Sequence, residues 1–441
     1  MATANVNHEG YHRRLRVVQS IIHSYGLQSV SVTPVEYVEH IPFQYNNYIY
    51  KVELSQPATT ANFANKTQRP GTSVPPESGV SVLILRLSNP RAEDLNNANR
   101  VENEVAAQSL FRQQLSASYP ALTHLLPAVY AWEPCRWPLV PDEAGFAWTM
   151  NEFMPGANLD EQFREMQLAE KLAVVEQVAD IFAALQNTPL PSSLKTHIGG
   201  LTFDGATAQV VGAQMPLTPA GPWDKYEEMW VSQLQKQLDD ADGSWALKGW
   251  KEAGLRDRID KLLDAARIAH LLEGVDLSQR VLVHADLTMN NMLFDKESKR
   301  VTALLDFDFS RVTHPVHEYF TGLWDLGGGW VHSNDEKLHR AVVTGNFEAR
   351  DEATSPEDKV VWEVAKAWNS ALNARGVLRP SQIGGIEKLE RLRQFEEALA
   401  PFHLSSTVRL ERQKRKTPQE TDELIKEATD RLESLLVELG A

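Results

Sequence analysis

The stretch VLVHADLTMNNMLFD, residues 281–295, places His284, Asp286 and Asn291 in a short polar gap between two apolar runs. Both runs have the length and composition of buried strands. A third apolar run, VTALLDFDF (301–309), follows the turn-like KESKR. The pattern predicts a strand, a polar loop, a strand, a turn and a third strand, with acidic and amide side chains close together at the strand ends.

Asp286, Asn291 and Asp306 are the residue types that phosphoryl transfer from ATP requires. Mg²⁺ prefers hard oxygen ligands and usually takes only one or two from the protein, for which Asn291 and Asp306 are suited. The reaction also needs a carboxylate that accepts or orients the proton of the attacking hydroxyl, a role that suits Asp286. Asp308, expected on the same strand face as Asp306, is interpreted either as a second metal contact or as a structural hydrogen bonder.

HADLTMNNML followed by ALLDFD resembles the catalytic and metal-binding segments of the aminoglycoside phosphotransferase family, whose fold is similar to that of protein kinases. PFQYNNYIYKVEL, RLSNP, NRVENEVA, EFMPG and GGLTFD add a resemblance to a group of fungal proteins in that family. The resemblance implies ATP and Mg²⁺ as cofactors, Asp286 as the catalytic base, and Asn291 and Asp306 as magnesium ligands. His284 would brace the loop and not react.

A chain of 441 residues is longer than one core usually supports, which predicts two lobes. Together with the resemblance, this predicts an α+β, two-lobed protein-kinase-like fold. Residues 1–152 would form a mainly β nucleotide-binding lobe. Residues 153–441 would form a helical lobe with the catalytic loop at 284–291 and the metal-binding segment at 304–308.

Hydrophobic periodicity predicts the elements of both lobes. Residues 48–54 alternate as a half-buried strand does, and residues 80–88 form a more continuously apolar inner strand. Between them, residues 56–79 contain four prolines among Thr, Asn, Ser and Gly, which predicts a flexible hairpin loop. Helices are predicted at 11–25, 99–115, 168–185, 224–240, 256–272, 357–375, 386–400 and after Thr417.

The last helix has a clear start signal in Thr417, Pro418 and Glu420. Its apolar stripe predicts packing on the body of the lobe. The alternative is a helix that binds a partner, so a homodimer is possible but not established by the sequence. The stripe consists of Leu424, Ala428, Leu432, Leu435 and Leu439.

In the upper lobe, strand alternation directs Arg86 to the same face as Val82 and Ile84. A buried arginine needs an opposite charge, and Glu104 on the following helix is the candidate. In the kinase-like fold a strand lysine paired with a helix glutamate holds the ATP phosphates, and the resemblance implies that Arg86 and Glu104 take those places. The alternative interpretation is a structural ion pair.

Two further segments depart from, or add to, the family pattern. PFQYNNYIY lacks glycine where a phosphate-covering turn is expected, so Asn46 and Asn47 are the residues that could present backbone N–H groups to phosphate. Ala285 stands where the family most often has glycine, a minor change unless the backbone needs a positive φ. In EFMPG, the resemblance implies that the backbone of Glu152 and Met154 binds adenine.

Composition limits the partners. The 59 acidic and 44 basic residues give a formal charge of −15, which argues against nucleic acid and anionic membrane as partners. Cys135 is the only cysteine, which excludes an intramolecular disulfide. The N-terminus lacks the apolar core of a signal peptide, and no apolar stretch reaches the length of a membrane span. A cytoplasmic location is therefore expected.

The predicted function is ATP- and Mg²⁺-dependent phosphotransfer to a hydroxyl group of a small-molecule acceptor, with the acidic charge favouring an amine-bearing one. Trp324 and Asp325 could contact such an acceptor, although a tryptophan in a helical lobe is more often core. One alternative is a nucleotide-binding pseudokinase or scaffold protein with little or no catalysis. Another keeps the fold but changes the reaction to hydrolysis or nucleotidyl transfer. The identity of the acceptor does not follow from the sequence.

Overall fold

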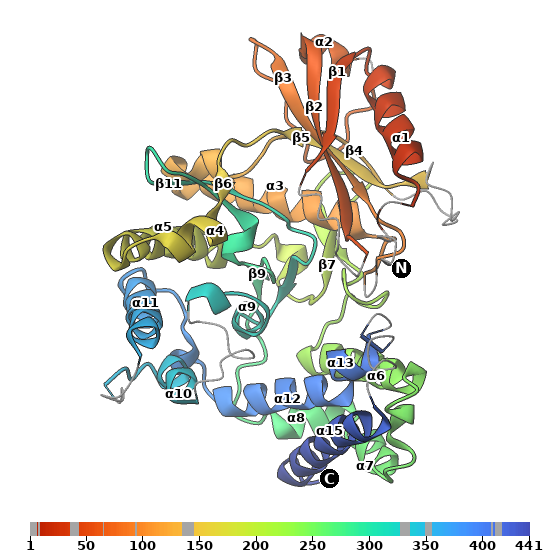
Figure 1. Ribbon diagram of the computed structural model, residues 1–441, viewed down its shortest axis with the longest axis vertical. Coiled ribbons are helices and arrows are strands. Elements are labelled where there is room, and N and C mark those ends of the chain that lie inside the picture. The colour runs from red at the N-terminus through yellow and green to blue at the C-terminus, as the bar shows by residue number, and fades with distance from the viewer. Residues whose placement is uncertain are drawn as a thin grey trace.

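The computed structural model has an upper lobe built on one β-sheet and a lower lobe built mainly from helices (Figure 1). This arrangement confirms the predicted α+β, two-lobed fold. Cys135 and the tip of the loop after the first strand lie outside the described residues. The structure describes residues 7, 9–35, 44–64, 66–92, 95–134, 145–326, 336–348, 355–406, 409–410 and 417–441.

The upper lobe contains a five-stranded antiparallel sheet in the order β1-β2-β3-β5-β4. Alternate residues of β2 and β3 enter a core that the amphipathic helix α1 covers through Val18 and Ile22. The sheet ends with β5 at Glu152, where the sequence predicts the boundary between the lobes. The elements are α1 (Tyr11–Ser24), β1 (Ser29–Pro34), β2 (Asn47–Ala58), α2 (Thr60–Ala64), β3 (Val80–Ser88), α3 (Arg100–Ser118), η1 (Pro120–Leu125), β4 (Val129–Glu133) and β5 (Trp148–Glu152).

The predicted hairpin of β2 and β3 is present, but the prediction that 56–79 is a flexible loop is wrong for its first part. Strand β2 extends to Ala58, and helix α2 follows it. Phe63 in α2 is buried, and its ring lies 5.3 Å from the ring of Tyr25. A single aromatic side chain with a place in the core thus ordered a stretch whose average composition predicts disorder.

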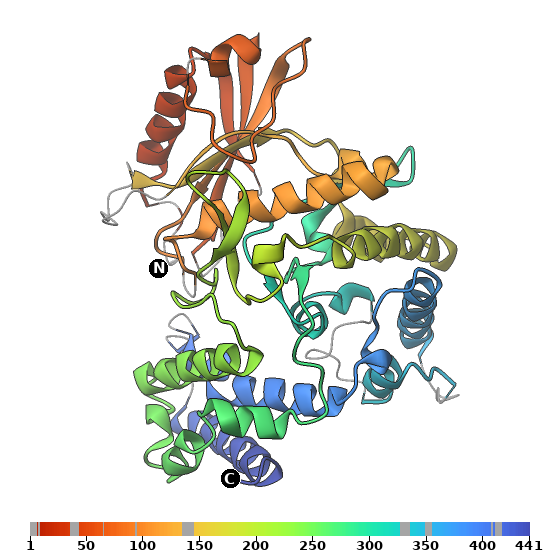
Figure 2. The same ribbon diagram turned by 180° about the vertical axis from the view of Figure 1, so that it is seen from behind.

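Helix α3 lies between the sheet and the lower lobe, as both views show (Figures 1 and 2). Near its start, Val101 and Val105 pack with Trp132 of the sheet. Further along, α3 joins the core of the lower lobe, where the ring of Phe111 lies 6.2 Å from that of Phe307. The helix is therefore shared by the hydrophobic cores of both lobes.

Short strand pairs and long helices make up the lower lobe. Its strands form the antiparallel pairs β9–β12 and β7–β8 and the sheet β11-β10-β6. In the described part of the chain, no helix is long and apolar enough to cross a membrane. The elements are β6 (Ala157–Asn158), α4 (Leu159–Glu165), α5 (Leu168–Gln186), η3 (Ser192–Leu194), β7 (Gly200–Phe203), β8 (Val210–Ala213), α6 (Tyr226–Gly243), η4 (Lys248–Trp250), α7 (Arg256–Asp260), α8 (Ala265–Leu271), β9 (Val281–Val283), η5 (Met289–Asn291), β10 (Met292–Asp295), β11 (Arg300–Leu304), β12 (Arg311–Thr313), α9 (Val316–Thr321), η6 (Trp324–Leu326), α10 (Glu336–Thr344), α11 (Pro356–Ala374), η7 (Pro380–Gln382), α12 (Ile386–Leu399), α13 (Phe402–Ser405) and α15 (Pro418–Glu438).

Two sequence predictions about lower-lobe helices have different outcomes. The single helix predicted at 256–272 is wrong, because α7 ends at Asp260 and a new helix, α8, begins after Asp264, whose side chain caps it by accepting the N–H of Arg267 at 3.0 Å. The last helix, α15, begins as predicted with Thr417 in a capping box with Glu420. Its apolar stripe is buried except at Leu424, which is partly buried, and the helix packs on α12, so the packed-helix interpretation is confirmed.

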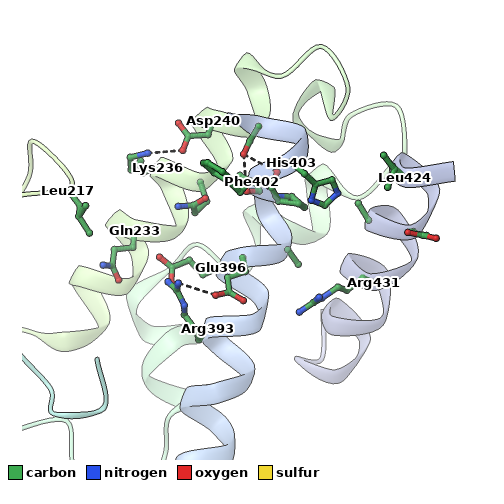
Figure 3. Close-up of a pocket in the computed structure, with 18 of the residues that line it drawn as sticks. Leu217, Gln233, Lys236, Asp240, Arg393, Glu396, Phe402, His403, Leu424 and Arg431 are labelled. Atoms are coloured by element: carbon green, nitrogen blue, oxygen red, sulfur yellow. Dashed lines mark hydrogen bonds and ion pairs between the residues drawn. The ribbon is translucent and has the colours of Figure 1, made fainter. Parts of the chain in front are cut away.

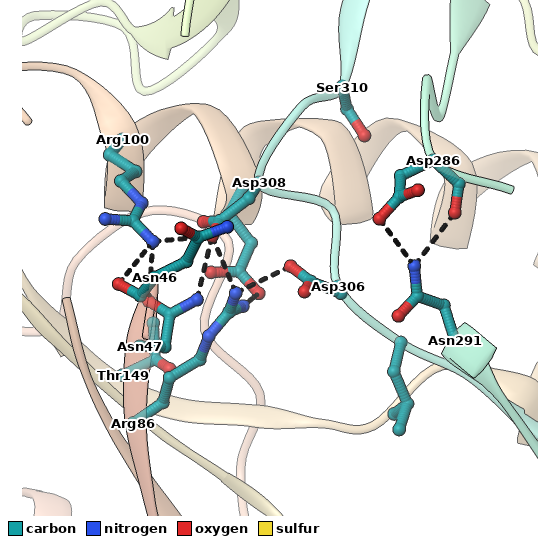
Figure 4. A network of polar contacts seen from close by, with 12 residues as sticks. Asn46, Asn47, Arg86, Arg100, Thr149, Asp286, Asn291, Asp306, Asp308 and Ser310 are labelled. Carbon is teal, nitrogen blue, oxygen red and sulfur yellow. Dashed lines mark hydrogen bonds and ion pairs between the residues drawn. The ribbon is translucent and has the colours of Figure 1, made fainter. Parts of the chain in front are cut away.

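The strand predicted at residues 301–309 is shorter than expected. Strand β11 ends at Leu304, and the backbone of Asp306 has a φ of 61°, which no strand residue adopts. Asp306 and Asp308 therefore lie in a loop and not on one strand face, which corrects the prediction. The turn directs Asp306 and Asp308 toward the upper lobe (Figure 4).

Three buried histidines make the stability of the fold depend on pH. Burial lowers the pKa of His284 and His314 to about 4 and that of His317 well below 6.5. The unfolded chain therefore binds more protons than the folded chain as pH falls from about 6.5 to 4. The stabilising contribution is present above pH 6.5 and is lost as pH falls.

We expect His314→Asn to weaken this pH dependence. Nδ1 of His314 accepts the N–H of Val316 at 3.2 Å, and an asparagine oxygen can accept it instead without titrating. Between pH 7 and 5, the wild type should lose on the order of 1–2 kcal/mol more free energy of unfolding than the variant. Urea unfolding at both pH values measures the difference. His270→Asn, at an exposed histidine, is the control. Equal losses in wild type and His314→Asn would contradict the prediction.

Candidate active site

The loop between β9 and β10 places Asp286 and Asn291 side by side. Nδ2 of Asn291 donates to both the carbonyl oxygen and Oδ2 of Asp286, each at 2.9 Å. The amide oxygen of Asn291 consequently faces away from Asp286 (Figure 4). Burial, with a smaller effect from the charge of Asp306, raises the pKa of Asp286 to about 7. The two predicted residues are therefore held in one geometry by two hydrogen bonds from a single amide nitrogen.

His284 braces the catalytic loop, as the family resemblance implies. Its side chain is fully buried, with Nε2 lying 3.0 Å from the carbonyl oxygen of Leu305, and its ring centroid lies 4.5 Å from that of Phe307 with the two planes tilted by 56°. The low pKa that burial imposes keeps the ring neutral at pH 7. His284 thus links the loop that carries Asp286 to the segment that carries Asp306.

Glu318 on α9 is a second brace, and sequence reasoning missed it. Its carboxylate accepts the backbone N–H groups of His284 at 2.7 Å and of Ala285 at 3.0 Å. Burial raises the pKa of Glu318 to about 7 despite these bonds. Asp325 acts similarly on the far side of the loop by accepting the N–H of Met289 at 2.6 Å. A signal for Glu318 was present in the sequence, because an acid within the apolar run VHEYF needs a partner.

The backbone at Ala285 is left-handed, with a φ of 64°. The sequence analysis treats alanine at this position as a minor change unless the backbone needs a positive φ. The φ of Ala285 is positive, so the replacement of glycine by alanine is not a minor change here. An L-residue in this conformation is strained by roughly 1–2 kcal/mol. Glu318 holds this conformation in place, since it binds the N–H groups of two consecutive residues there.

Arg86 forms the predicted ion pair with Glu104 and contacts two further carboxylates. Its Nη1 binds Oε1 of Glu104. Its Nη2 lies 2.6 Å from Oδ1 of Asp306 and 2.9 Å from Oδ2 of Asp308 (Figure 4). Burial acts against the charge of Arg86, but the three carboxylates outweigh it and hold its pKa above the ordinary value. The guanidinium therefore stands between the upper lobe and the predicted metal-binding segment.

Asp308 is the most heavily bonded acid of the site. Only 1% of its surface is exposed, and its Oδ2 also accepts Nδ2 of Asn47 and Nη2 of Arg100, each at 2.8 Å. Burial alone would raise its pKa, but the guanidinium groups of Arg100 and Arg86 lower it to about 2. These contacts favour the interpretation of Asp308 as a structural hydrogen bonder over that of a second metal contact.

The remaining oxygen donors fit a magnesium ion. Arg86 binds Oδ1 of Asp306, and Asn291 uses its nitrogen for Asp286, so Oδ2 of Asp306 and Oδ1 of Asn291 have no bond within the described residues. Those residues also contain no group of three or more His, Cys, Asp or Glu arranged to hold a metal. Mg²⁺ needs no such cage, because it typically shares one or two protein ligands with nucleotide phosphates and water.

Asn46 and Asn47 lie at the base of the β1–β2 loop. The carbonyl oxygen of Asn46 accepts Nη2 of Arg100 at 2.6 Å and the N–H of Asn89 at 2.9 Å, and the side chain of Asn47 binds both Arg100 and Asp308. Their polar groups thus already contribute to the network that links the lobes. Phosphate contacts through their backbone N–H groups stay a prediction, since residues 36–43 lie outside the described residues.

The connector that follows β5 carries the two residues that are predicted to bind adenine through their backbone. The N–H of Glu152 donates to the carbonyl oxygen of Ala128 at 2.8 Å, so it is not available to a ligand. Met154 lies beyond the strand and is half-buried. Adenine binding by these residues stays a prediction. Trp324, for which a core position and a contact to the acceptor were the two interpretations, is 43% exposed and therefore not a core residue.

A pocket of about 600 Å³ lies in the lower helical bundle, between α6, α12 and α15 (Figure 3). Its charged groups compensate one another: Lys236 pairs with Asp240 at 2.7 Å, and Arg393 binds Glu396 at 2.7 Å and Glu397 at 3.0 Å. The predicted site residues do not line it. The pocket is therefore separate from the candidate active site.

Comparison with known proteins identifies the family of this chain. The model of the phosphotransferase enzyme family matches residues 77–353, which is more than half of the chain. No curated protein matches.

Among solved structures, a candidate aminoglycoside phosphotransferase from Ralstonia eutropha JMP134 is 15% identical, with 97% of this chain and 96% of that chain covered and a TM-score of 0.47. The streptomycin–ATP complex of the phosphotransferase APH(2″)-IIa is 12% identical, with coverage of 84% and 99% and a TM-score of 0.37. Ethanolamine kinase from Plasmodium vivax is 12% identical, with coverage of 92% and 81% and a TM-score of 0.38. Likenesses this distant carry no information about the substrate of this chain.

We expect Ala285→Gly to stabilise the protein. Glycine removes the strain of the left-handed backbone but increases the entropy of the unfolded chain, so the net gain in the free energy of unfolding should be about 0.5–1 kcal/mol. Urea unfolding measures it. The matched control is Ala173→Gly on the exposed face of α5, which should lose about 1 kcal/mol. A loss of similar size at Ala285 would show that its conformation is not strained.

Proposed function

Because the chain belongs to the phosphotransferase enzyme family, we propose that it transfers the γ-phosphate of ATP to a hydroxyl group of a small molecule in a Mg²⁺-dependent reaction. The observation that carries the proposal is the convergence of Asp286, Asn291 and Asp306 opposite the Arg86–Glu104 pair. These residues come from distant parts of the chain, and general structural packing does not require this combination of acids, amide and guanidinium.

Asp286 orients the acceptor hydroxyl in this proposal. Asn291 holds one carboxylate oxygen of Asp286, and the other oxygen is left to accept the hydroxyl proton as the oxygen attacks the γ-phosphate. The raised pKa that burial produces suits a group that takes up a proton near neutral pH. His284 and Glu318 keep the loop in position and do not contact the reacting atoms.

Arg86 would hold the phosphates directly, and the oxygen ligands of Asn291 and Asp306 would hold them through Mg²⁺. Asn291 and Asp306 would bind Mg²⁺, which when bound neutralises charge on the phosphates during transfer. Glu104 orients the guanidinium of Arg86 so that its positive charge would lie beside the phosphate oxygens. In this proposal the backbone of Glu152 and Met154 binds the adenine ring. The backbone N–H groups of Asn46 and Asn47 bind the phosphates.

An amine-bearing acceptor is the chemistry that the charge of the chain favours. The exposed face of Trp324 can stack on such a group. Asp325, beside it, is less available, because it already accepts the N–H of Met289. We also propose that the protein is cytoplasmic and similar to fungal members of the family.

Asp306→Ala tests the metal site. We expect wild type to bind ATP more tightly with Mg²⁺ than without it in calorimetry, and this difference to disappear in Asp306→Ala, because the variant lacks a carboxylate ligand. Glu297→Ala, at an exposed acid in the β10–β11 turn, should bind like wild type. Failure of the wild type to bind any ATP would overturn the proposed function.

Asp286→Asn separates catalysis from mere binding. We expect the variant to keep ATP affinity within a few-fold of wild type and to lose at least 100-fold in phosphotransfer, the size of effect typical of general-base removal. The measurement is transfer of labelled γ-phosphate to a panel of amino alcohols and amino sugars, with product mass identifying phosphate against AMP. ATP binding without wild-type turnover on any acceptor, and no difference in the variant, would favour the pseudokinase or scaffold alternative.

A further inference from the structure

We propose that Asp308 and Arg100 are positioning residues that hold Arg86 and the base of the β1–β2 loop against the metal-binding segment. The inference deepens the proposed function and rests on it. Neither residue needs to contact nucleotide or metal. They act by fixing the upper lobe on the loop that carries Asp306.

Asp308 gathers three elements of the upper lobe onto one oxygen. Its Oδ2 accepts Nδ2 of Asn47 at the start of β2, Nη2 of Arg86 on β3 and Nη2 of Arg100 at the start of α3, all within 2.9 Å (Figure 4). One such donor would not offset the desolvation cost of this buried carboxylate. Three donors offset it, but only while the three elements keep this arrangement. The contacts therefore specify where the sheet and α3 lie relative to the lower lobe.

Arginine at position 86 makes sense in this arrangement. Its Nη1 serves Glu104, while its Nη2 is shared between Asp306 and Asp308. If Asp306 bound a metal ion instead of Arg86, Asp308 would still hold Nη2, so the guanidinium would keep its position. A lysine has a single nitrogen and cannot span the carboxylates in this way.

Arg100 occupies a position that is unfavourable for a cation without a specific partner. It is the first residue of α3, where the helix dipole disfavours positive charge, and its side chain is fully buried. Asp308 offsets both costs. The same Nη2 donates to the carbonyl oxygen of Asn46 and, at 3.0 Å, to Oδ1 of Asn47. A loop without glycine is thus anchored at its base by a side chain.

Asn103, one turn further along α3, secures the other end of the segment. Its Nδ2 donates to the carbonyl oxygen of Ser310 at 2.7 Å, and its Oδ1 accepts the N–H of Leu201 at 2.7 Å. The segment that follows Asp306 is therefore tied to α3 at two points. Helix α3 therefore couples the position of the upper lobe to that of Asp306.

The test is ATP binding by calorimetry, with and without Mg²⁺, on Asp308→Asn and Arg100→Gln. We expect each variant to bind ATP about tenfold more weakly in both conditions, because a charge-assisted contact that positions Arg86 is lost. The ratio of the two affinities should stay at the wild-type value. The double variant should be no weaker than the weaker single variant, because the two residues act as one unit.

Controls separate this role from a structural or metal-binding one. Arg112→Gln removes another arginine of α3, which binds the carbonyl oxygens of Leu126 and Pro127, and it should leave ATP affinity unchanged. Asn47→Ala, a milder change, should weaken binding a few-fold even if Asp308→Asn fails to fold. Melting temperatures of all variants show whether binding was measured on folded protein.

The outcomes distinguish the two proposals. If Asp308→Asn loses only the Mg²⁺-dependent part of binding, Asp308 is a metal ligand and the inference is overturned. If Asp308→Asn, Arg100→Gln and Asn47→Ala all bind as wild type does, the inference is also wrong while the proposed function stands. If wild type itself binds no ATP, the proposed function fails first.

Discussion

The buried carboxylate of Asp308 is the constraint on which the arrangement of the two lobes depends. A carboxylate that is 1% exposed cannot stay ionised without strong compensation, and every cation that compensates it comes from the upper lobe. The hydrophobic contribution of α3, which packs in both cores, brings the lobes together without selecting a register. The directional ion pairs supply that register, and they do so at the site where nucleotide phosphates are expected.

The loop between β9 and β10 illustrates how a fold holds a costly conformation in place. Ala285 is left-handed, and Glu318 is a buried acid whose pKa lies near neutrality because of its burial. Each is unfavourable alone, but the N–H groups that Ala285 and His284 present are the donors that Glu318 requires. Strain and desolvation are thereby balanced against hydrogen bonds, and the result is a fixed direction for Asp286.

Sequence reasoning succeeded where one local pattern carried the signal. The alternation in β2, the apolar run of β3 and the capping box of α15 each depend on neighbouring residues only. It failed where a distant partner decided the outcome. Phe63 orders α2 because Tyr25 and Tyr130 receive it, a contact that composition cannot reveal. The residues that brace the site are widely separated in sequence from the loops they hold.

The sequence by itself determined the family and the pairing of Arg86 with Glu104, because these follow from residue type, spacing and the need of a buried charge for a partner. Only the tertiary structure decided that Asp308 binds guanidinium groups and that Arg100 joins them. Burial is a property of the whole fold, and it makes Asp308, an acid two residues after Asp306, an anchor between the lobes.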